Sequence, residues 1–182
     1  VRQWTANLHM GLQRLLRLPV PVVCAVQGFA MGGGVALLAG CDLVVAGSSS
    51  KLGSAFAQLG FTCDSGSSAV LTARMGTARA RRFMLMTEML TAAEAQACGL
   101  VDQVVADDKL QDEALALARR LANGPTVAYG EIKRLFLKAP TTSLETILED
   151  EALTLARVSA TADAQEGIAA MIERRKPQFK GR

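Results

Sequence analysis

The chain has 182 residues, enough for one ordinary hydrophobic core with a helical appendage. Half of its residues are apolar and a fifth are charged, a composition typical of globular proteins and unlike that of disordered or fibrous ones. Its 20 basic and 17 acidic side chains give a net charge of +3 without a long run of one sign, so no nucleic-acid or membrane-surface partner is indicated.

The four cysteines, at positions 24, 41, 63 and 98, form no Cys-x-x-Cys pair. We therefore expect a reduced, cytoplasmic protein without a disulfide framework. Residues 18–41 carry no charge and are long enough to cross a membrane, but Pro19, Pro21 and a glycine cluster would break such a helix within the bilayer. We expect neither a membrane span nor a signal peptide at the first residues.

The first expected element is a helix over residues 3–17, where Leu8, Leu12 and Leu15 recur at helical spacing. His9, the only histidine, lies beside this apolar stripe. We expect it to be a surface or partly packed residue rather than a catalytic one.

Apolar, β-branched runs predict strands at residues 20–26 and 42–46. About fifteen residues separate them, the length that a crossover between parallel strands needs. Between them, residues 28–34 hold four glycines in seven positions. Because glycine costs conformational entropy on folding, such a cluster indicates that the backbone must approach something closely.

Residues 47–63 are a polar turn followed by mixed apolar and small residues, a pattern that predicts a short strand and a loop. Asp64 and the small residues after it predict the start of a helix that ends near Gly76. Thr91 and Glu94 form a capping-box pattern. The other expected elements are a strand at 100–105 and helices at 78–86, 107–123, 125–138, 142–161 and 163–175, the last two with start signals at Thr142 and Asp163. The fold class is α/β: a core over residues 1–140, followed by a helical region over 141–182.

The glycine run does not fit the common glycine motifs. Its spacing differs from the dinucleotide fingerprint, it lacks the Lys-Ser/Thr of a P-loop, and the chain has no Gly-x-Ser-x-Gly elbow. No cluster of His, Cys or carboxylate residues has the spacing of metal ligands. A turn that feeds a helix N-terminus suits an oxyanion hole, although a turn that only lets helix and sheet pack closely would look the same.

Four segments resemble the crotonase, or enoyl-CoA hydratase/isomerase, superfamily. They read AVQGFAMGGGVALLAGCDLVVAG, SKLGSAFAQLGFTCDSGSS, RMGTARARRFMLMTEMLTAAEAQACGLVDQVV and DAQEGIAAMIERRKPQFKGR. The resemblance covers the chain from residue 19 onward and implies a crotonase-like spiral of ββα units.

The resemblance implies an acyl-coenzyme A thioester as substrate. Coenzyme A is then part of the substrate, and neither a cofactor nor a metal is implied. In the family, two backbone N–H groups hold the thioester oxygen; Gly33 matches one, with Gly32 beside it in the substrate site. By family resemblance, the second donor is expected in a loop upstream of Val1. About a third of the usual domain is expected there as well.

Family hydratases use two glutamates, and the matching positions here are Ala36 and Phe56. The remaining carboxylate is Asp64, at a position that isomerase members use; the segment is most similar to ring-1,2-epoxyphenylacetyl-CoA isomerases. We expect Phe56, Leu59 and Phe61 to form an apolar pocket that contacts the substrate and raises the pKa of Asp64. A plain helix N-cap is the alternative role of Asp64.

The expected function is that of an acyl-CoA isomerase of fatty acid or phenylacetate catabolism, with Asp64 as the single proton shuttle. A hydratase or lyase of the same superfamily is the alternative within enzymes. A non-catalytic acyl-CoA-binding homologue is the alternative from another class. By resemblance, residues 142–175 are expected to join copies of the chain into a homotrimer or hexamer.

Overall fold

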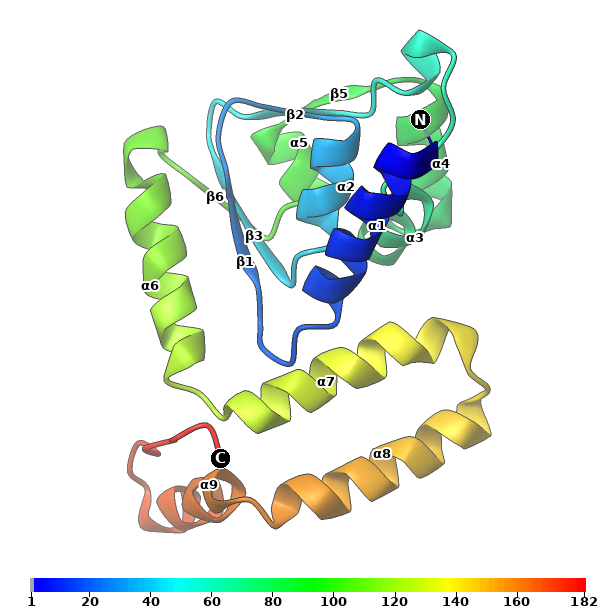
Figure 1. The fold of residues 1–182 in the computed structure, drawn as a ribbon. Coiled ribbons are helices and arrows are strands. Elements are labelled where there is room, and N and C mark those ends of the chain that lie inside the picture. The colour runs from blue at the N-terminus through cyan, green and yellow to red at the C-terminus, as the bar shows by residue number, and fades with distance from the viewer. Residues whose placement is uncertain (1) are drawn as a thin grey trace. The chain divides into compact units, whose positions relative to one another are not determined.

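The computed structural model describes residues 2–182, apart from the side chain of Trp4. Figure 1 follows the chain from its blue N-terminal helix to its red C-terminal end. The chain divides into two compact units, residues 1–16 with 22–116 and residues 17–21 with 117–182. This division lies upstream of the boundary expected near residue 140, because the helix at 126–138 packs on the helix that follows it.

Within the described residues, the first unit contains two three-stranded sheets (Figure 1). Their strands are β1 (Val23–Val26), β3 (Leu43–Gly47) and β6 (Gln103–Val105) in one sheet, and β2 (Phe29–Met31), β4 (Lys51–Gly53) and β5 (Met89–Thr91) in the other. The first sheet is parallel throughout in the order β1-β3-β6, which confirms the predicted parallel pair. In the second, β2 runs parallel to β4 and β5 runs antiparallel to it.

Helices make up most of the remaining chain. The α-helices are α1 (Arg2–Leu16), α2 (Gly33–Ala39), α3 (Ser67–Met75), α4 (Thr77–Leu85), α5 (Ala92–Ala97), α6 (Leu110–Ala122), α7 (Thr126–Lys138), α8 (Leu144–Ser159) and α9 (Ala162–Glu173). Short 3-10 turns lie at Ala57–Leu59, Asp107–Lys109 and Ala139–Thr141. Across residues 2–182, every helix is too short or too polar to cross a bilayer.

The core of the first unit joins sheet and helices. Leu52 of β4, Leu71 of α3 and Phe83 of α4 are fully buried in one cluster with Val35 of α2. Burying an aliphatic or aromatic side chain of this size stabilises a fold by about 1.5–3 kcal/mol. Helix α2, which begins in the glycine run, is therefore held by hydrophobic packing in one cluster with α3 and α4.

A largely enclosed arginine, whose side chain is 12% exposed, joins α3 to the end of α2. The Arg74 guanidinium donates to the carbonyl oxygens of Cys41 at 2.6 Å, Asp42 at 3.2 Å and Ala39 at 3.4 Å. It also donates to the Asp102 carboxylate at 2.7 Å. These carbonyls lie where α2 ends and the chain turns into β3, so Arg74 satisfies backbone acceptors that the helix leaves unpaired.

Two of the strands were not predicted. Residues 29–31 form β2 inside the glycine-rich stretch, and residues 89–91 form β5. A strand of three residues is too short to show an alternating pattern of apolar and polar side chains. Both are stabilised by pairing with β4, a contact between segments that are distant in sequence.

The predicted helix starts are partly correct. The capping box of Thr91 and Glu94 is confirmed at α5. The N-caps of α8 and α9 are instead Ser143 and Thr161, one residue after and two residues before the predicted starts. Helix α3 begins after Gly66 rather than at Asp64, because Gly66 adopts a left-handed conformation with φ 69°.

Asp163 binds the C-terminal segment instead of starting a helix. Its side chain is 97% buried, with an exposed fraction of only 3%. The carboxylate accepts backbone N–H bonds from Lys180 at 2.7 Å, Gly181 at 2.8 Å and Arg182 at 3.2 Å. A buried charge with this many donors is satisfied, and it holds the last residues against α9.

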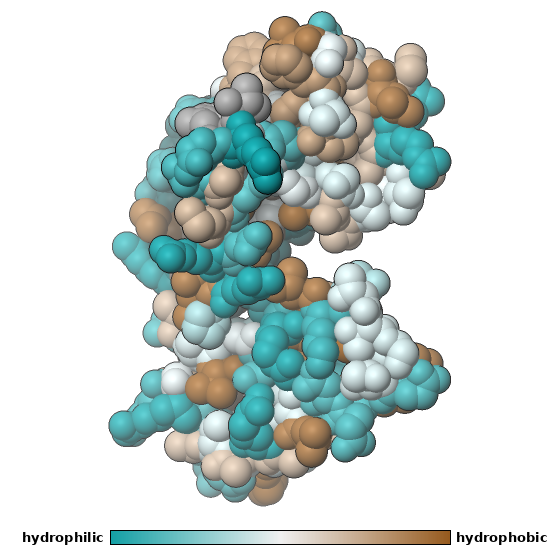
Figure 2. Space-filling view, turned by 45° about the vertical axis from the view of Figure 1, so that its right-hand side comes forward, coloured by the Kyte–Doolittle hydropathy of each residue, from teal (hydrophilic) through white to brown (hydrophobic). Residues whose placement is uncertain are grey.

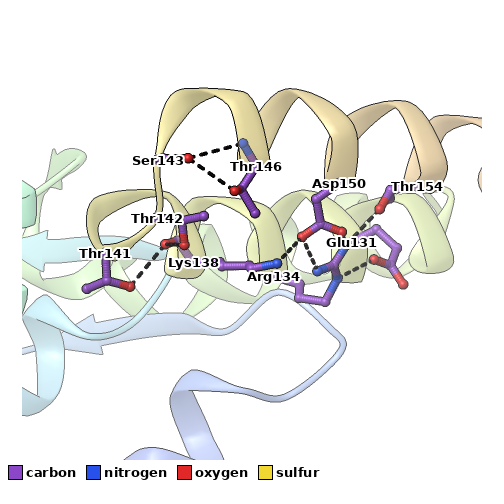
Figure 3. Close-up of polar contacts among 9 residues, drawn as sticks. All are labelled: Glu131, Arg134, Lys138, Thr141, Thr142, Ser143, Thr146, Asp150 and Thr154. Carbon is purple, nitrogen blue, oxygen red and sulfur yellow. Dashed lines mark hydrogen bonds and ion pairs between the residues drawn. The ribbon is translucent and has the colours of Figure 1, made fainter.

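In the second unit, an ion-pair network connects α7 and α8 (Figure 3). Both terminal nitrogens of Arg134 donate to the Asp150 carboxylate at 3.1 Å, and one of them also donates to the hydroxyl of buried Thr154 at 2.7 Å. Lys138 adds a bond to Asp150 at 2.7 Å. The hydrogen bonds from Arg134, and then from Lys138, hold the pKa of the Asp150 carboxyl well below its ordinary range.

We expect Arg74→Met to destabilise the first unit by about 2 kcal/mol, because buried carbonyl oxygens and Asp102 would lose their donor. Urea denaturation of the variant would measure the free energy of unfolding. Arg81→Met is the matched control, since Arg81 is exposed on α4. An Arg74→Met protein as stable as the Arg81→Met control would contradict this role.

Candidate active site

The glycine run forms the turn from β2 into α2. Gly32 adopts a positive φ of 53° and its N–H donates to Gly53 O at 3.0 Å. A positive φ is strained for any residue with a side chain, which explains glycine at this position. Helix α2 begins at Gly33, whose N–H has no acceptor among the described residues. First-turn amides of a helix have no partner within the helix and are free to bind an external oxygen.

The loop that carries Asp64 closes over this turn. A Cβ built on Gly33 would lie 3.2 Å from Ser65 Oγ, and one built on Gly32 would lie 3.7 Å from the Phe56 ring. Ser65 is buried and has a positive φ of 55°, and its hydroxyl has no hydrogen-bond partner within residues 2–182 as described. Glycine at 33 therefore allows the close approach of Ser65, whereas the contact at Gly32 is an ordinary one, and the predicted residues Gly32, Gly33 and Phe56 lie together.

Asp64 forms a contact that was not predicted. His9 Nε2 lies 2.7 Å from Asp64 Oδ1, although 55 positions separate the two residues. The backbone N of Ser65 lies 3.3 Å from the same His9 nitrogen. The side chains of His9 and Asp64 are 43% and 29% exposed, so both remain accessible to solvent.

The expected rise in the pKa of Asp64 is wrong. Hydrogen bonding from the Ser65 backbone N–H lowers the pKa of this carboxyl and outweighs the opposing effect of burial; the His9 side chain lowers it further. The apolar pocket that was to desolvate Asp64 is open, because Leu59 and Phe61 are each 67% exposed. A carboxylate that accepts hydrogen bonds near solvent prefers its charged form.

The other predicted substrate-binding residues occupy two different environments. Ala36 is 1% exposed and packs inside the core, one turn into α2. Phe56 and Phe61 line a groove of about 260 Å³, together with Cys63, Met84 and others of the same loop and α4. The groove thus lies between α4 and the residues that directly precede Asp64.

Two residues of the site were missed: His9 and Ser65. His9 shares a helical face with Leu12 and Leu16, three and seven positions later, and that spacing was the available signal. Nothing in the sequence pairs this face with Asp64.

Among residues 2–182, no group of three His, Cys, Asp or Glu side chains could hold a metal ion.

The arrangement has the components of enolate chemistry. A free amide at the start of α2 offers a donor to an oxygen that gains negative charge, and an accessible carboxylate lies on the adjoining loop. An ionised carboxylate can accept a proton from carbon when the carbanion is stabilised in this way.

Known proteins are similar to this chain in sequence and in fold. The sequence profile of the Enoyl-CoA hydratase/isomerase family matches residues 2–182. The chain is 40% identical over 171 residues to a 1,2-epoxyphenylacetyl-CoA isomerase of Escherichia coli, which covers 94% of this chain and 65% of that protein. It is 34% identical over 169 residues to a 2,3-dehydroadipyl-CoA hydratase of the same bacterium, which covers 93% of this chain and 66% of that protein.

The structural comparison agrees with the sequence comparison. The crystal structure of an enoyl-CoA hydratase from Polaromonas sp. JS666 matches with a TM-score of 0.90 at 30% sequence identity, covering 96% of this chain and 68% of that one. The chain spans about two thirds of the length of these proteins. The predicted crotonase-like α/β fold is confirmed, and the chain belongs to the enoyl-CoA hydratase/isomerase family.

Proposed function

We propose that this chain carries the active site of an acyl-CoA isomerase, in which the Gly33 amide holds the thioester oxygen and Asp64 moves the proton. The observation that carries the proposal is the contact of the Asp64 loop with the start of α2, through Ser65 and Gly33. Asp64, the remaining candidate carboxylate, therefore belongs to the loop that packs against the free amide of Gly33.

The chemistry requires one base and one stabilised oxyanion. Asp64 takes a proton from a carbon next to the thioester carbonyl, and the electron pair moves onto the thioester oxygen. The Gly33 N–H donates to that oxygen while it is negatively charged. Asp64 then returns the same proton to another carbon of the substrate, the double bond moves, and no water is consumed.

One feature favours isomerisation over hydration. Ala36 and Phe56 carry no ionisable group, whereas addition of water requires the water to be held and activated by groups that exchange protons. The lowered pKa of Asp64 keeps its carboxyl ionised at neutral pH, so that it can act as the base in either reaction. Relatives include proteins named as isomerase and as hydratase, so the two activities need a direct test.

The groove lined by Phe56 and Phe61 is the proposed place for the apolar part of the acyl group. Its volume of about 260 Å³ is small, and its walls also include Met84 and Leu85 of α4. An apolar groove next to a single carboxylate suits an acyl chain that must be held in place without addition of water to its double bond.

We expect Asp64→Asn to lower kcat for double-bond migration by about 10²- to 10⁴-fold, because asparagine cannot carry the proton. The assay follows migration in a panel of enoyl-CoA thioesters, with calorimetry to show that thioester binding persists. Asp108→Asn, at a carboxylate that is 74% exposed, is the control and should keep full activity.

The same assay separates the alternatives. Migration at the wild-type rate in Asp64→Asn would overturn the proposed role of Asp64. Water addition by the wild-type protein, without a migrated product, would favour a hydratase or lyase. Thioester binding without turnover of any panel member would favour a non-catalytic acyl-CoA-binding homologue.

Gly33→Ala should lower kcat by about 10²-fold, the usual effect of losing one oxyanion donor. The new Cβ would lie 3.2 Å from Ser65 Oγ, and we expect the amide to move as this tight contact is relieved. Adding Ser65→Ala should restore part of the activity. Gly34→Ala is the control, because a Cβ there meets nothing within 4 Å; equal losses in Gly33→Ala and Gly34→Ala would count against the oxyanion role.

We also propose that copies of the chain associate through its C-terminal helices as a homotrimer or hexamer. Helices α7 and α8 line an apolar groove of about 600 Å³, and Phe136 and Leu155 in its walls are 77% and 70% exposed. Figure 2 shows apolar side chains, in brown, at the surface of the molecule. Exposed apolar patches on this scale usually mark contact sites.

Sedimentation should therefore give a mass of three or six chains, and Leu155→Glu should lower it. Glu145→Gln on the same helix should leave it unchanged. A monomeric wild-type protein would rule out this assembly.

A further inference from the structure

The chain's only histidine is aimed at its candidate catalytic carboxylate. His9 lies on α1 and Asp64 lies on the loop before α3, yet Nε2 and Oδ1 are 2.7 Å apart. Both residues belong to the first compact unit. The distance is that of a hydrogen bond to a charged acceptor.

Packing of α1 holds His9 in this position. Leu12, three residues later on the same helical face, is buried, and Leu15 packs against the core cluster. One more turn along, Leu16 Cδ2 lies 2.9 Å from the Cβ position of Gly40, so α1 lies directly against the end of α2. His9 is therefore presented by a helix that is anchored on the same helix whose first amide is Gly33.

The two contacts of His9 Nε2 require different protonation states of the ring. To bond Asp64 Oδ1 at 2.7 Å when Asp64 is ionised, Nε2 must carry a proton and donate it. To accept the Ser65 N–H at 3.3 Å, the same nitrogen must be unprotonated. The shorter contact is the stronger one while Asp64 is charged, which assigns the proton to Nε2 and leaves the Ser65 N–H to the carboxylate.

No other charged side chain among the described residues bonds this pair. Helix α2 contains no ionisable residue, and Arg74 of α3 is engaged by Asp102 and backbone carbonyls. The remaining charges on α1 are Arg2 and Arg14, seven positions before and five positions after His9. After the Ser65 backbone N–H, His9 is the next group that lowers the pKa of Asp64.

We propose that His9 is a positioning residue for Asp64: its Nε2–H holds Oδ1, so that the carboxylate takes and returns the substrate proton through Oδ2. Oδ2 has no side-chain partner among the described residues. When Oδ2 carries the proton, Oδ1 is the carbonyl oxygen of the acid and still accepts from Nε2–H. His9 thus keeps the carboxyl in one orientation through the whole proton transfer, and this role rests on the proposed function of Asp64.

Kinetics of three variants test the positioning role. His9→Leu should lower kcat by about 10- to 100-fold with little change in KM, because the carboxylate loses its orientation but the binding groove is untouched. The acidic limb of its pH–kcat profile should move to higher pH, since a group that lowers the pKa of Asp64 is gone. His9→Gln, whose amide nitrogen can reach the place of Nε2, should recover much of the activity.

Asn7→Leu is the control, at an exposed position of the same helix. It should behave as wild type. If His9→Leu keeps the wild-type kcat and pH profile, or if His9→Gln is as impaired as His9→Leu, the inference is overturned.

A second measurement does not depend on turnover. In protein with ¹⁵N-labelled histidine, the His9 ring signals are identified by their loss in His9→Gln. The neutral ring should carry its proton on Nε2 in wild type and on Nδ1 in Asp64→Ala, where Nε2 is left to accept the Ser65 N–H. The same tautomer in both proteins would overturn the inference whatever the activity.

The two proposals fail in different ways. Full activity of Asp64→Asn would overturn the proposed function even if the tautomer changes as expected. An inactive Asp64→Asn protein, together with an unaltered His9→Leu protein, would overturn only the role of His9.

Discussion

The candidate site depends on the absence of side chains at Gly32 and Gly33. The loop that carries Asp64 approaches Gly33 so closely that a Cβ there would press on Ser65 Oγ, and the positive φ of Gly32 would strain any residue with a side chain. The same bare backbone leaves the first amide of α2 without an acceptor among the described residues. One constraint therefore produces both the oxyanion donor and its proximity to the loop of the carboxylate.

The surrounding structure keeps this turn in place from several directions. Arg74 binds the carbonyls at the end of α2, and Asp102, its partner, also accepts the Val44 N–H at 2.6 Å at the start of β3. Hydrophobic packing of Val35 and Leu71 holds α2 and α3 together. Such over-determined packing allows Ser65 to remain at a positive φ and with a hydroxyl that has no partner in the described part of the chain, two features that cost free energy.

Elements with a clear local pattern were predictable, and two of the three-residue strands were not. The β-branched runs and the length between them predicted the parallel pair of β1 and β3. Strands β2 and β5 were missed because three residues show no period and depend on pairing with β4. The start of α3 was misplaced because the left-handed conformation of Gly66, rather than the carboxylate of Asp64, ends the preceding loop.

The sequence alone determined the family and the glycine run, because residue type and local spacing carry that information. It also determined that Ala36 and Phe56 stand where family hydratases have glutamates. Only the tertiary structure decided that His9 meets Asp64 across 55 positions, and that hydrogen bonds lower the pKa of this carboxyl rather than burial raising it. Both outcomes depend on how α1 packs on α2 and how the loop folds over Gly33. Contacts between distant segments are set by the packing of the whole unit, which no local pattern encodes.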